Sequence, residues 1–115
     1  MEYRRFGDTD INVSVLGFGC GAVGGLMVRG QHADMIRSVE YALEYGVNYF
    51  DTARMYGDGL SEIHTGAILR EIGAAQAVVG TKVRLSPSDY INIPKAIETQ
   101  IENSLERLGL DTVDI

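Results

Sequence analysis

Residues 34–53 read DMIRSVEYALEYGVNYFDTA, and their hydrophobic period changes at one point. From Met35 to Leu43 the apolar side chains recur at helical spacing, and Gly46 stands where a left-handed residue commonly ends a helix. The run VNYFDTA follows at once and has the composition of a strand. A helix that leads directly into a short strand is the repeating unit of an α/β fold, so this stretch predicts that class.

The same alternation continues on both sides of this stretch. The predicted strands are VSVLGF, VNYFDTA, AQAVVGTKV and the final DTVDI, and the predicted helices are residues 34–46, 61–73 and 93–109. Ser61 is expected to cap the second helix, and residues 86–92 are expected to form a polar connection. Such a series favours a parallel sheet with right-handed crossovers, preceded by a short hairpin of residues 3–6 and 12–15.

The third predicted helix and the end of the chain bear on the extent of the domain. One apolar stripe precedes Gly109 and consists of Ile97, Ile101, Leu105 and Leu108. The chain then ends within DTVDI, which has the character of a strand that has only begun. We therefore expect residues 1–115 to be part of one larger domain, with no second domain in this stretch.

Length, composition and charge exclude several kinds of protein. The chain has 115 residues, 45% of them hydrophobic and 23% charged, which is enough for one domain with a packed core. Ten basic and sixteen acidic residues give a formal net charge of −6, which argues against a surface that binds nucleic acid. No apolar run approaches the ~20 residues of a membrane helix, and residues 1–10 lack the apolar core of a signal peptide. We expect a cytoplasmic protein with no membrane partner.

The glycine-rich residues 19–24, GCGAVG, match the pattern G-x-G-x-x-G of dinucleotide-binding folds. In those folds a helix opens directly from the glycines and points its N-terminus at a pyrophosphate. Here the next helical pattern begins only near Ala33, which leaves that mechanism without its helix. A tight bend and a wide loop after a buried strand is the favoured interpretation.

Cysteine and histidine offer no metal site. Cys20 is the single cysteine, so this chain can form neither an internal disulfide nor a site with several cysteine ligands. A small buried hydrophobic residue is favoured for Cys20 over a reactive thiol. His32 and His64 stand alone in polar surroundings, without the spacing of metal ligands, and are predicted to lie on the surface.

Three ionisable residues are expected to meet at one end of the sheet. Asp51 closes one predicted strand, Lys82 closes the next, and Tyr56 lies in the loop between them. In parallel α/β folds the carboxyl ends of the strands hold the ligands. An ammonium group near a phenol lowers the pKa of the phenol from about 10, and a carboxylate keeps the ammonium charged, so the tyrosine can act as a general acid. A structural ion pair and a loop aromatic are the alternatives for these residues taken singly.

Several separated motifs in this order resemble the aldo-keto reductase family. FDTARMYGDGLSE, residues 50–62, is similar to the segment that carries the family's catalytic aspartate and tyrosine, and VVGTKV is similar to its lysine strand. Residues 3–19 resemble its opening hairpin and first strand, and residues 104–115 resemble the end of its third helix and the start of its fourth strand. The resemblance implies the amino-terminal half of a (β/α)8 TIM barrel, with about four βα units, that reduces an aldehyde or ketone with NADPH.

The resemblance also implies roles for single residues. Tyr56 matches the proton donor to the carbonyl oxygen, and Lys82 and Asp51 match the lysine that tunes it and the partner of that lysine. The cofactor-binding residues implied are Gly19, Cys20 and Gly21 at the mouth of the first barrel strand, together with Asp51. The family's catalytic histidine follows the strand that opens with VDI, and is therefore expected to lie beyond Ile115.

One alternative remains at this stage, and another is excluded. A non-catalytic or truncated member of the same fold would act as a binding or regulatory module, and the intact trio argues against it. A short-chain dehydrogenase would need a tyrosine followed four residues later by lysine, which this sequence does not contain. Substrate identity, the choice of NADPH over NADH and the oligomeric state are left open by these residues. Expressed alone, the 115 residues are expected to be neither an active reductase nor a well-behaved monomer.

Overall fold

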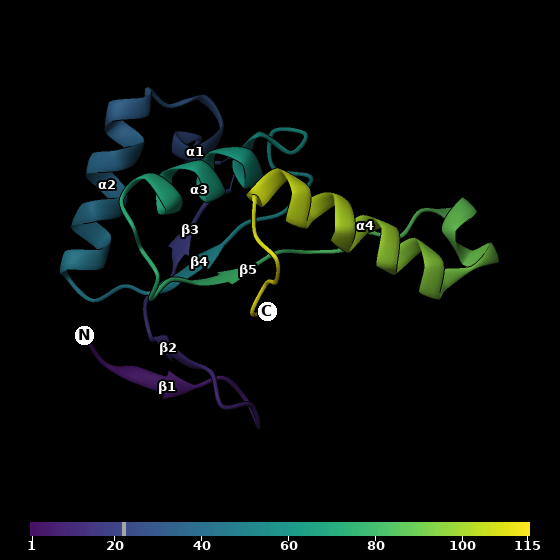
Figure 1. The fold of residues 1–115 in the computed structure, drawn as a ribbon, viewed down its shortest axis with the longest axis horizontal. Coiled ribbons are helices and arrows are strands. Elements are labelled where there is room, and N and C mark those ends of the chain that lie inside the picture. The colour runs from purple at the N-terminus through teal and green to yellow at the C-terminus, as the bar shows by residue number, and fades with distance from the viewer. Residues whose placement is uncertain (22) are drawn as a thin grey trace.

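The computed structural model describes residues 1–21 and 23–115 (Figure 1). The strands are β1 (Tyr3–Arg5), β2 (Asn12–Ser14), β3 (Phe18–Gly19), β4 (Tyr49–Asp51) and β5 (Val78–Gly80). The helices are α1 (Leu26–Arg29), α2 (His32–Glu44), α3 (Leu60–Glu71) and α4 (Ile93–Leu108), with a 3-10 helix η1 (Pro87–Ile91). Gly46, Gly73 and Gly109 have positive φ and follow α2, α3 and α4, which confirms them as helix stops.

Strands β3, β4 and β5 form one parallel sheet in that order, as the alternating sequence predicts. Gly19 pairs with Asp51, and Asp51 pairs with Gly80, so the three strands end in register. The carboxyl ends of all three strands therefore lie along one edge, and the loops that leave them share that edge.

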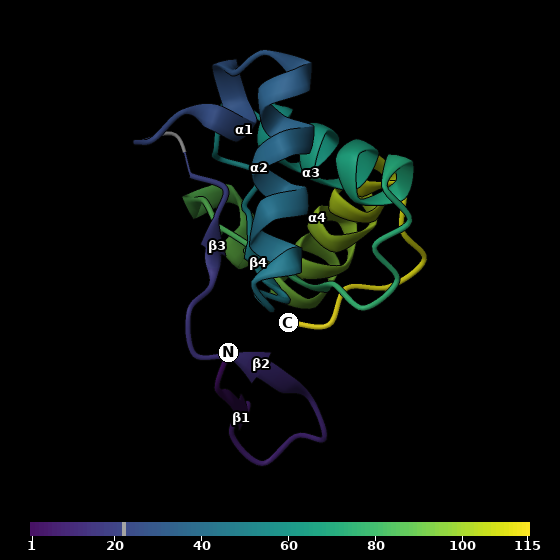
Figure 2. The same ribbon diagram turned by 90° about the vertical axis from the view of Figure 1, so that its left-hand side faces the viewer.

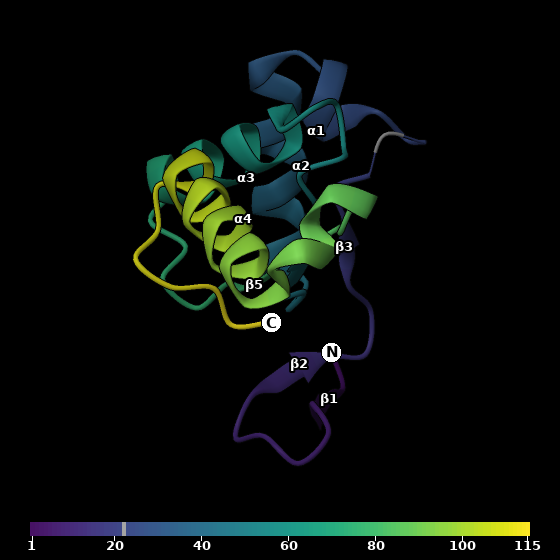
Figure 3. The same cartoon turned by 90° about the vertical axis from the view of Figure 1, so that its right-hand side faces the viewer.

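Helices α2, α3 and α4 lie on one face of this sheet, as the two side views show (Figure 2 and Figure 3). Phe50 of β4 and Val79 of β5 are buried on the helix side. The core between sheet and helices consists of Cys20, Met27, Met35, Val39, Phe50, Ile68, Leu69, Val79 and Leu108. Because side chains alternate along a strand, Tyr49 and Asp51 point to the opposite face, which carries no helix in the described residues.

The predicted hairpin of β1 and β2 is confirmed and projects from the body of the molecule (Figure 1). Asn48 joins it to the residue before β4. Its side-chain oxygen accepts from the Ser14 amide at 2.7 Å, and its side-chain nitrogen donates to the Asn12 carbonyl at 3.0 Å. The Tyr3 hydroxyl donates to the Gly46 carbonyl at 2.8 Å. The hairpin is thus held to the turn between α2 and β4.

Two predictions about the helices are wrong. The helix α1 begins directly after Gly25, whereas the sequence pattern places no helix before Ala33. A single turn is too short to give a periodic signal, and it is held here because Met27 and Val28 are buried. Ser61 does not cap α3 either, because the N-cap residue is Gly59 and Ser61 is fully buried as the second residue of the helix.

His64 also departs from its predicted surface position. It is half-buried, and its Nδ1 donates to the Met27 carbonyl oxygen at 2.9 Å. His32 is exposed as predicted and lies 3.0 Å from Glu71. The difference arises from α1, because the carbonyl that holds His64 belongs to the turn of helix that the sequence pattern does not reveal.

The carboxyl-terminal part follows the prediction except in two places. Residues 111–115 are not a regular strand, although the Ile115 carbonyl accepts from the Thr81 amide at 3.0 Å and the Asp114 amide donates to Val79 at 3.0 Å. They thus lie beside β5, where a fourth parallel strand belongs. In α4 only Ser104 and Leu108 are buried, and Ile97 is 41% exposed because the first turns of the helix extend past α3.

Among the described residues, no helix has the length and apolar character needed to cross a bilayer.

Candidate active site

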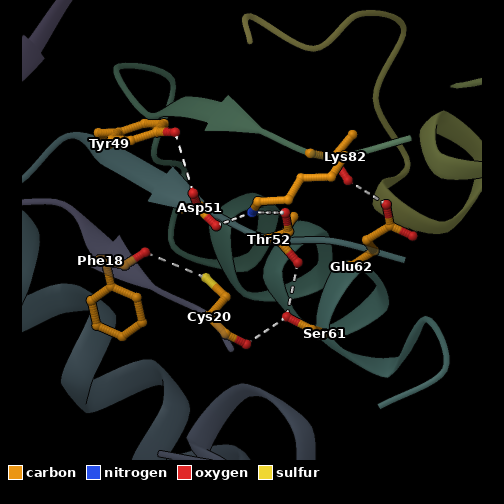
Figure 4. Close-up of polar contacts among 9 residues, drawn as sticks. Phe18, Cys20, Tyr49, Asp51, Thr52, Ser61, Glu62 and Lys82 are labelled. Atoms are coloured by element: carbon orange, nitrogen blue, oxygen red, sulfur yellow. Dashed lines mark hydrogen bonds and ion pairs between the residues drawn. The ribbon is translucent and has the colours of Figure 1, made fainter. Parts of the chain in front are cut away.

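The three residues expected to meet do lie together at the carboxyl edge of the sheet (Figure 4). Asp51 is the last residue of β4, and Lys82 follows β5 by two positions. The Lys82 ammonium group donates to the Asp51 carboxylate and, at 3.0 Å, to the Thr52 carbonyl. Side-chain exposure is 41% for Lys82 and 37% for Asp51, so this ion pair is partly open to solvent.

Tyr56 is brought to the pair by a sharply turned loop. The Lys82 Nζ lies over its ring, 4.9 Å from the centroid. Directly after it, residues 57–59 (GDG) have φ of +63°, +52° and +95°, a left-handed run that suits glycine and aspartate. This turn returns the chain into α3 and leaves the tyrosine beside the ends of β4 and β5.

The pKa of Lys82 is raised despite partial burial. Burial alone lowers the pKa of an ammonium group, and this is the largest single effect on Lys82. The hydrogen bonds with Asp51 and Tyr56, together with their negative charge when ionised, act in the opposite direction and outweigh it. Lys82 therefore keeps its proton and its positive charge beside the tyrosine at neutral pH.

The residues predicted to bind a cofactor have different surroundings. Gly19 is exposed, and a side chain there would meet open space beside Asp51. A Cβ on Gly21 would lie 3.8 Å from the Tyr56 ring, so this glycine borders the tyrosine. Cys20 is fully buried in the core on the helix side, and desolvation raises the pKa of its thiol to about 11. The prediction that Cys20 is buried is confirmed.

A chain of buried hydroxyls beneath the site is not apparent from the sequence pattern. The Ser61 hydroxyl donates to the Cys20 carbonyl at 2.8 Å, and the Thr52 hydroxyl lies 2.8 Å from the Ser61 oxygen (Figure 4). Since Ser61 has a single proton, Thr52 donates to it. These bonds join the first turn of α3 to the ends of β3 and β4, and the Thr52 carbonyl in turn holds Lys82.

Glu62 is a second residue that the sequence analysis leaves without a role. Its side chain is fully buried, accepts from the Thr81 hydroxyl at 2.6 Å and is paired with Arg107 Nε at 2.5 Å. The available signal is helical spacing, because Glu62 shares a face of α3 with the buried Thr65, Gly66 and Leu69. An acidic residue on an apolar face predicts a buried, paired carboxylate.

Tyr49 is a further neighbour that alternation along β4 places on the same face as Asp51. Its hydroxyl donates to Asp51 at 3.5 Å, and its ring lies against Gly17 and Gly80, where a Cβ would come within 3.0 and 3.2 Å of a ring carbon. Burial, followed by the negative charge of Asp51, raises the pKa of Tyr49. The open face is therefore built from polar side chains that contact one another.

A cleft of about 570 Å³ opens next to Lys82. Its lining includes Arg54, Met55, Lys82, Arg84, Leu85 and Pro87. The lining mixes cations with apolar side chains and also carries the Asp89 carboxylate, and Lys82 borders the cleft.

The chain has a parallel series of strands and helices, with lysine, aspartate and tyrosine at the carboxyl ends of its strands. This is the arrangement of a TIM barrel, a fold whose ligands bind at that end of the strands. Residues 15–115 match the family described as "Aldo/keto reductase family", and the chain belongs to this family. L-galactose dehydrogenase from Arabidopsis thaliana is 33% identical over 117 residues, covering all of this chain and 37% of the relative. Aldo-keto reductase YhdN from Bacillus subtilis (strain 168) is 35% identical over 122 residues, with the same two coverages.

Solved structures give the same result. Aldo-keto reductase AKR11C1 from Bacillus halodurans, in its holo form, matches with a TM-score of 0.76 and 31% identity, over 98% of this chain and 38% of that one. An aldo-keto reductase from Klebsiella pneumoniae in complex with NADPH matches with a TM-score of 0.69 and 26% identity, over 90% of this chain and 34% of that one. The chain thus has the fold of the amino-terminal part of an aldo-keto reductase barrel and spans little more than a third of its relatives' length.

Proposed function

We propose that the protein carrying this chain reduces an aldehyde or ketone with NADPH, with Tyr56 as the proton donor. The observation that carries the proposal is the position of the Lys82 ammonium group, which bonds to Asp51 and lies over the Tyr56 ring. Membership of an oxidoreductase family and the NADPH complex of the Klebsiella pneumoniae relative support it. The cytoplasmic location stays a prediction.

Each of the three side chains has a separate task in this reaction. Tyr56 donates its hydroxyl proton to the carbonyl oxygen as that oxygen gains negative charge. The Lys82 ammonium lies over the ring and offsets the negative charge that the tyrosine gains as it gives up its proton, because unlike charges attract. Asp51 and the Thr52 carbonyl fix the direction of the lysine and do not need to contact the substrate.

The residues at the end of β3 fit a nicotinamide cofactor. Gly19 has open space around its Cα at the edge of the sheet, next to Asp51, so a flat ligand can approach the backbone there. Gly19, Gly21 and Asp51 would hold the cofactor, which supplies the hydride. The Cys20 side chain points into the core, and its predicted part in cofactor binding is not tested by this arrangement.

The test is Tyr56→Phe in the intact protein, which removes the hydroxyl and keeps the ring over which Lys82 lies. We expect the NADPH-dependent reduction of a reactive aldehyde to fall at least ~10²-fold, with cofactor binding retained. Tyr41→Phe is the matched control, because Tyr41 is an exposed residue of α2, and it should keep its activity.

The outcomes of this test distinguish a reductase from a binding or regulatory module. Turnover by the unmodified protein and its loss in Tyr56→Phe support the reductase. Near-normal turnover in Tyr56→Phe contradicts the role of Tyr56. NADPH binding without turnover in the unmodified protein supports the binding or regulatory module.

A further inference from the structure

Glu62 is a buried carboxylate for which both oxygens have a partner. Its side chain has no exposed surface, Oε1 accepts from the Thr81 hydroxyl at 2.6 Å, and Oε2 is bonded by Arg107 Nε at 2.5 Å. Burial of a carboxylate is strongly unfavourable unless charge and hydrogen bonds compensate it. The geometry of these three residues is therefore fixed far more tightly than that of an exposed ion pair.

The three partners come from the segments that carry the catalytic side chains. Glu62 stands six residues after Tyr56, on the first turn of α3, and Thr81 immediately precedes Lys82. Figure 4 shows Glu62 on the far side of Lys82 from Asp51. The hydrogen bond between Thr81 and Glu62 is therefore a direct link between the lysine segment and the helix that follows the tyrosine loop.

Arg107 extends this link to the tyrosine loop itself. A Cβ on Gly59 would lie 2.8 Å from Arg107 Cδ, so the arginine stem covers the last left-handed residue of the loop. Arg107 Nη2 also donates to Ser104 at 3.1 Å, which orients the guanidinium group on α4. One connected group of side chains, with the fully buried Glu62 at its centre, thus contacts both the loop after Tyr56 and the residue before Lys82.

We propose that Glu62, held by Arg107 and bonded to Thr81, is a positioning residue that sets the placement of the Lys82 ammonium relative to Tyr56. Lys82 lies two residues beyond the end of β5, and the residue before it is held twice, by its amide to the Ile115 carbonyl and by its side chain to Glu62. The inference rests on the proposed reductase function for its catalytic consequence, but the placement of Lys82 can be measured without turnover.

The first experiment compares Thr81→Val with Thr81→Ser in the intact protein. Valine keeps the shape and removes the hydroxyl, whereas serine keeps the hydroxyl. We expect Thr81→Val to lower kcat at least ~10-fold with KM for aldehyde and NADPH within about twofold, because a small misplacement of a catalytic group costs rate more than binding. Thr81→Ser should restore most of the rate, which loss of packing alone would not explain.

The second experiment reads the position of Lys82 directly by competitive acetylation with acetic anhydride and mass spectrometry. Lys95 is the internal reference, since it lies exposed on α4. The Lys82 amine should react at least about threefold faster relative to Lys95 in Thr81→Val and in Glu62→Gln, because it has lost its fixed contact with Asp51. Glu71→Gln, the same change at an exposed ion pair that involves neither lysine, is the control and should leave the ratio unchanged.

Unchanged Lys82 labelling in Thr81→Val overturns the inference, whatever the effect on activity, and this variant serves if Glu62→Gln does not fold. Equal loss of kcat in the serine and valine variants overturns it as well. Faster labelling in a protein whose unmodified form reduces no carbonyl supports the positioning role and contradicts the proposed function instead.

Discussion

The two faces of the β3–β4–β5 sheet are built from alternate residues of the same strands, yet they have opposite chemistry. Phe50 points to the helices, is fully buried and contacts Phe18 with a ring separation of 5.4 Å. Its neighbour Asp51 points to the open face, is partly exposed and holds Lys82. One face is a dry core, and the other is a set of polar side chains that contact one another.

It follows from this difference that alternate residues of one strand have separate roles. Those on the helix face stabilise the fold, and those on the open face form the candidate site. A change on the helix face should alter the free energy of unfolding with little change in the site's chemistry. A change on the open face should alter turnover with little change in stability. The expected effects below run from the largest to the smallest.

Phe50→Ala should have the largest effect on stability. Removing a fully buried ring from the core leaves a cavity, and we expect the free energy of unfolding of the intact protein to fall by about 3–5 kcal/mol. Urea titration measures this change in the free energy of unfolding. Tyr90→Ala removes an exposed ring from η1, and as the control it should change stability by about 0.5 kcal/mol or less. Similar losses in both variants would contradict the assignment of Phe50 to the core.

Cys20 should make stability depend on alkaline pH. Its thiol has a pKa of about 11 in the fold, against an ordinary value of 9.0, so folding favours the protonated form. The stabilisation is complete below about pH 9 and is lost as pH rises towards 11, by at most about 2–3 kcal/mol. The free energy of unfolding, measured from pH 8 to 10.5, should fall more steeply with pH in the unmodified protein than in Cys20→Ala. Parallel curves would show that the thiol is not desolvated.

Tyr49→Phe should have the smallest effect, although it lies on the open face. The hydroxyl donates to Asp51 at 3.5 Å, a long hydrogen bond, and Asp51 keeps its ion pair with Lys82 without it. We expect a stability change of less than ~1 kcal/mol and a kcat/KM within about threefold of the unmodified protein. A loss of tenfold or more would make the Tyr49 hydroxyl part of the catalytic machinery and would weaken the separation of tasks between residues.

The order of the main elements could be predicted from the sequence because each carries a local signal. The stripe of α2 with Gly46 after it, the strand around Phe50 and the stop at Gly109 all depend on residues close together in the chain. Helix α1 and the half-buried position of His64 could not be predicted, because one turn of helix has no period and is held by burial of Met27.

Part of the candidate site could likewise be predicted from the sequence, and part of it could not. Asp51, Tyr56 and Lys82 could be found because they stand at strand ends, and parallel strands bring such ends to one edge. The contacts of Ser61 and Glu62 could not be predicted, because their partners, Cys20 and Arg107, lie 41 and 45 residues away. The sequence alone gives no sign that residues so far apart along the chain are in contact.

The sequence by itself determined the α/β alternation, the positions of the helix stops and the three residues of the proposed catalytic edge, since local period and turn chemistry act within a few residues. Only the tertiary structure decided which side chains are buried together. The link from Thr81 through Glu62 to Arg107 exists because α3 and α4 approach so closely that a Cβ on Gly66 would overlap the backbone of Leu108. Burial then makes pairing of the charges obligatory, since an unpaired carboxylate in that space would be strongly destabilising.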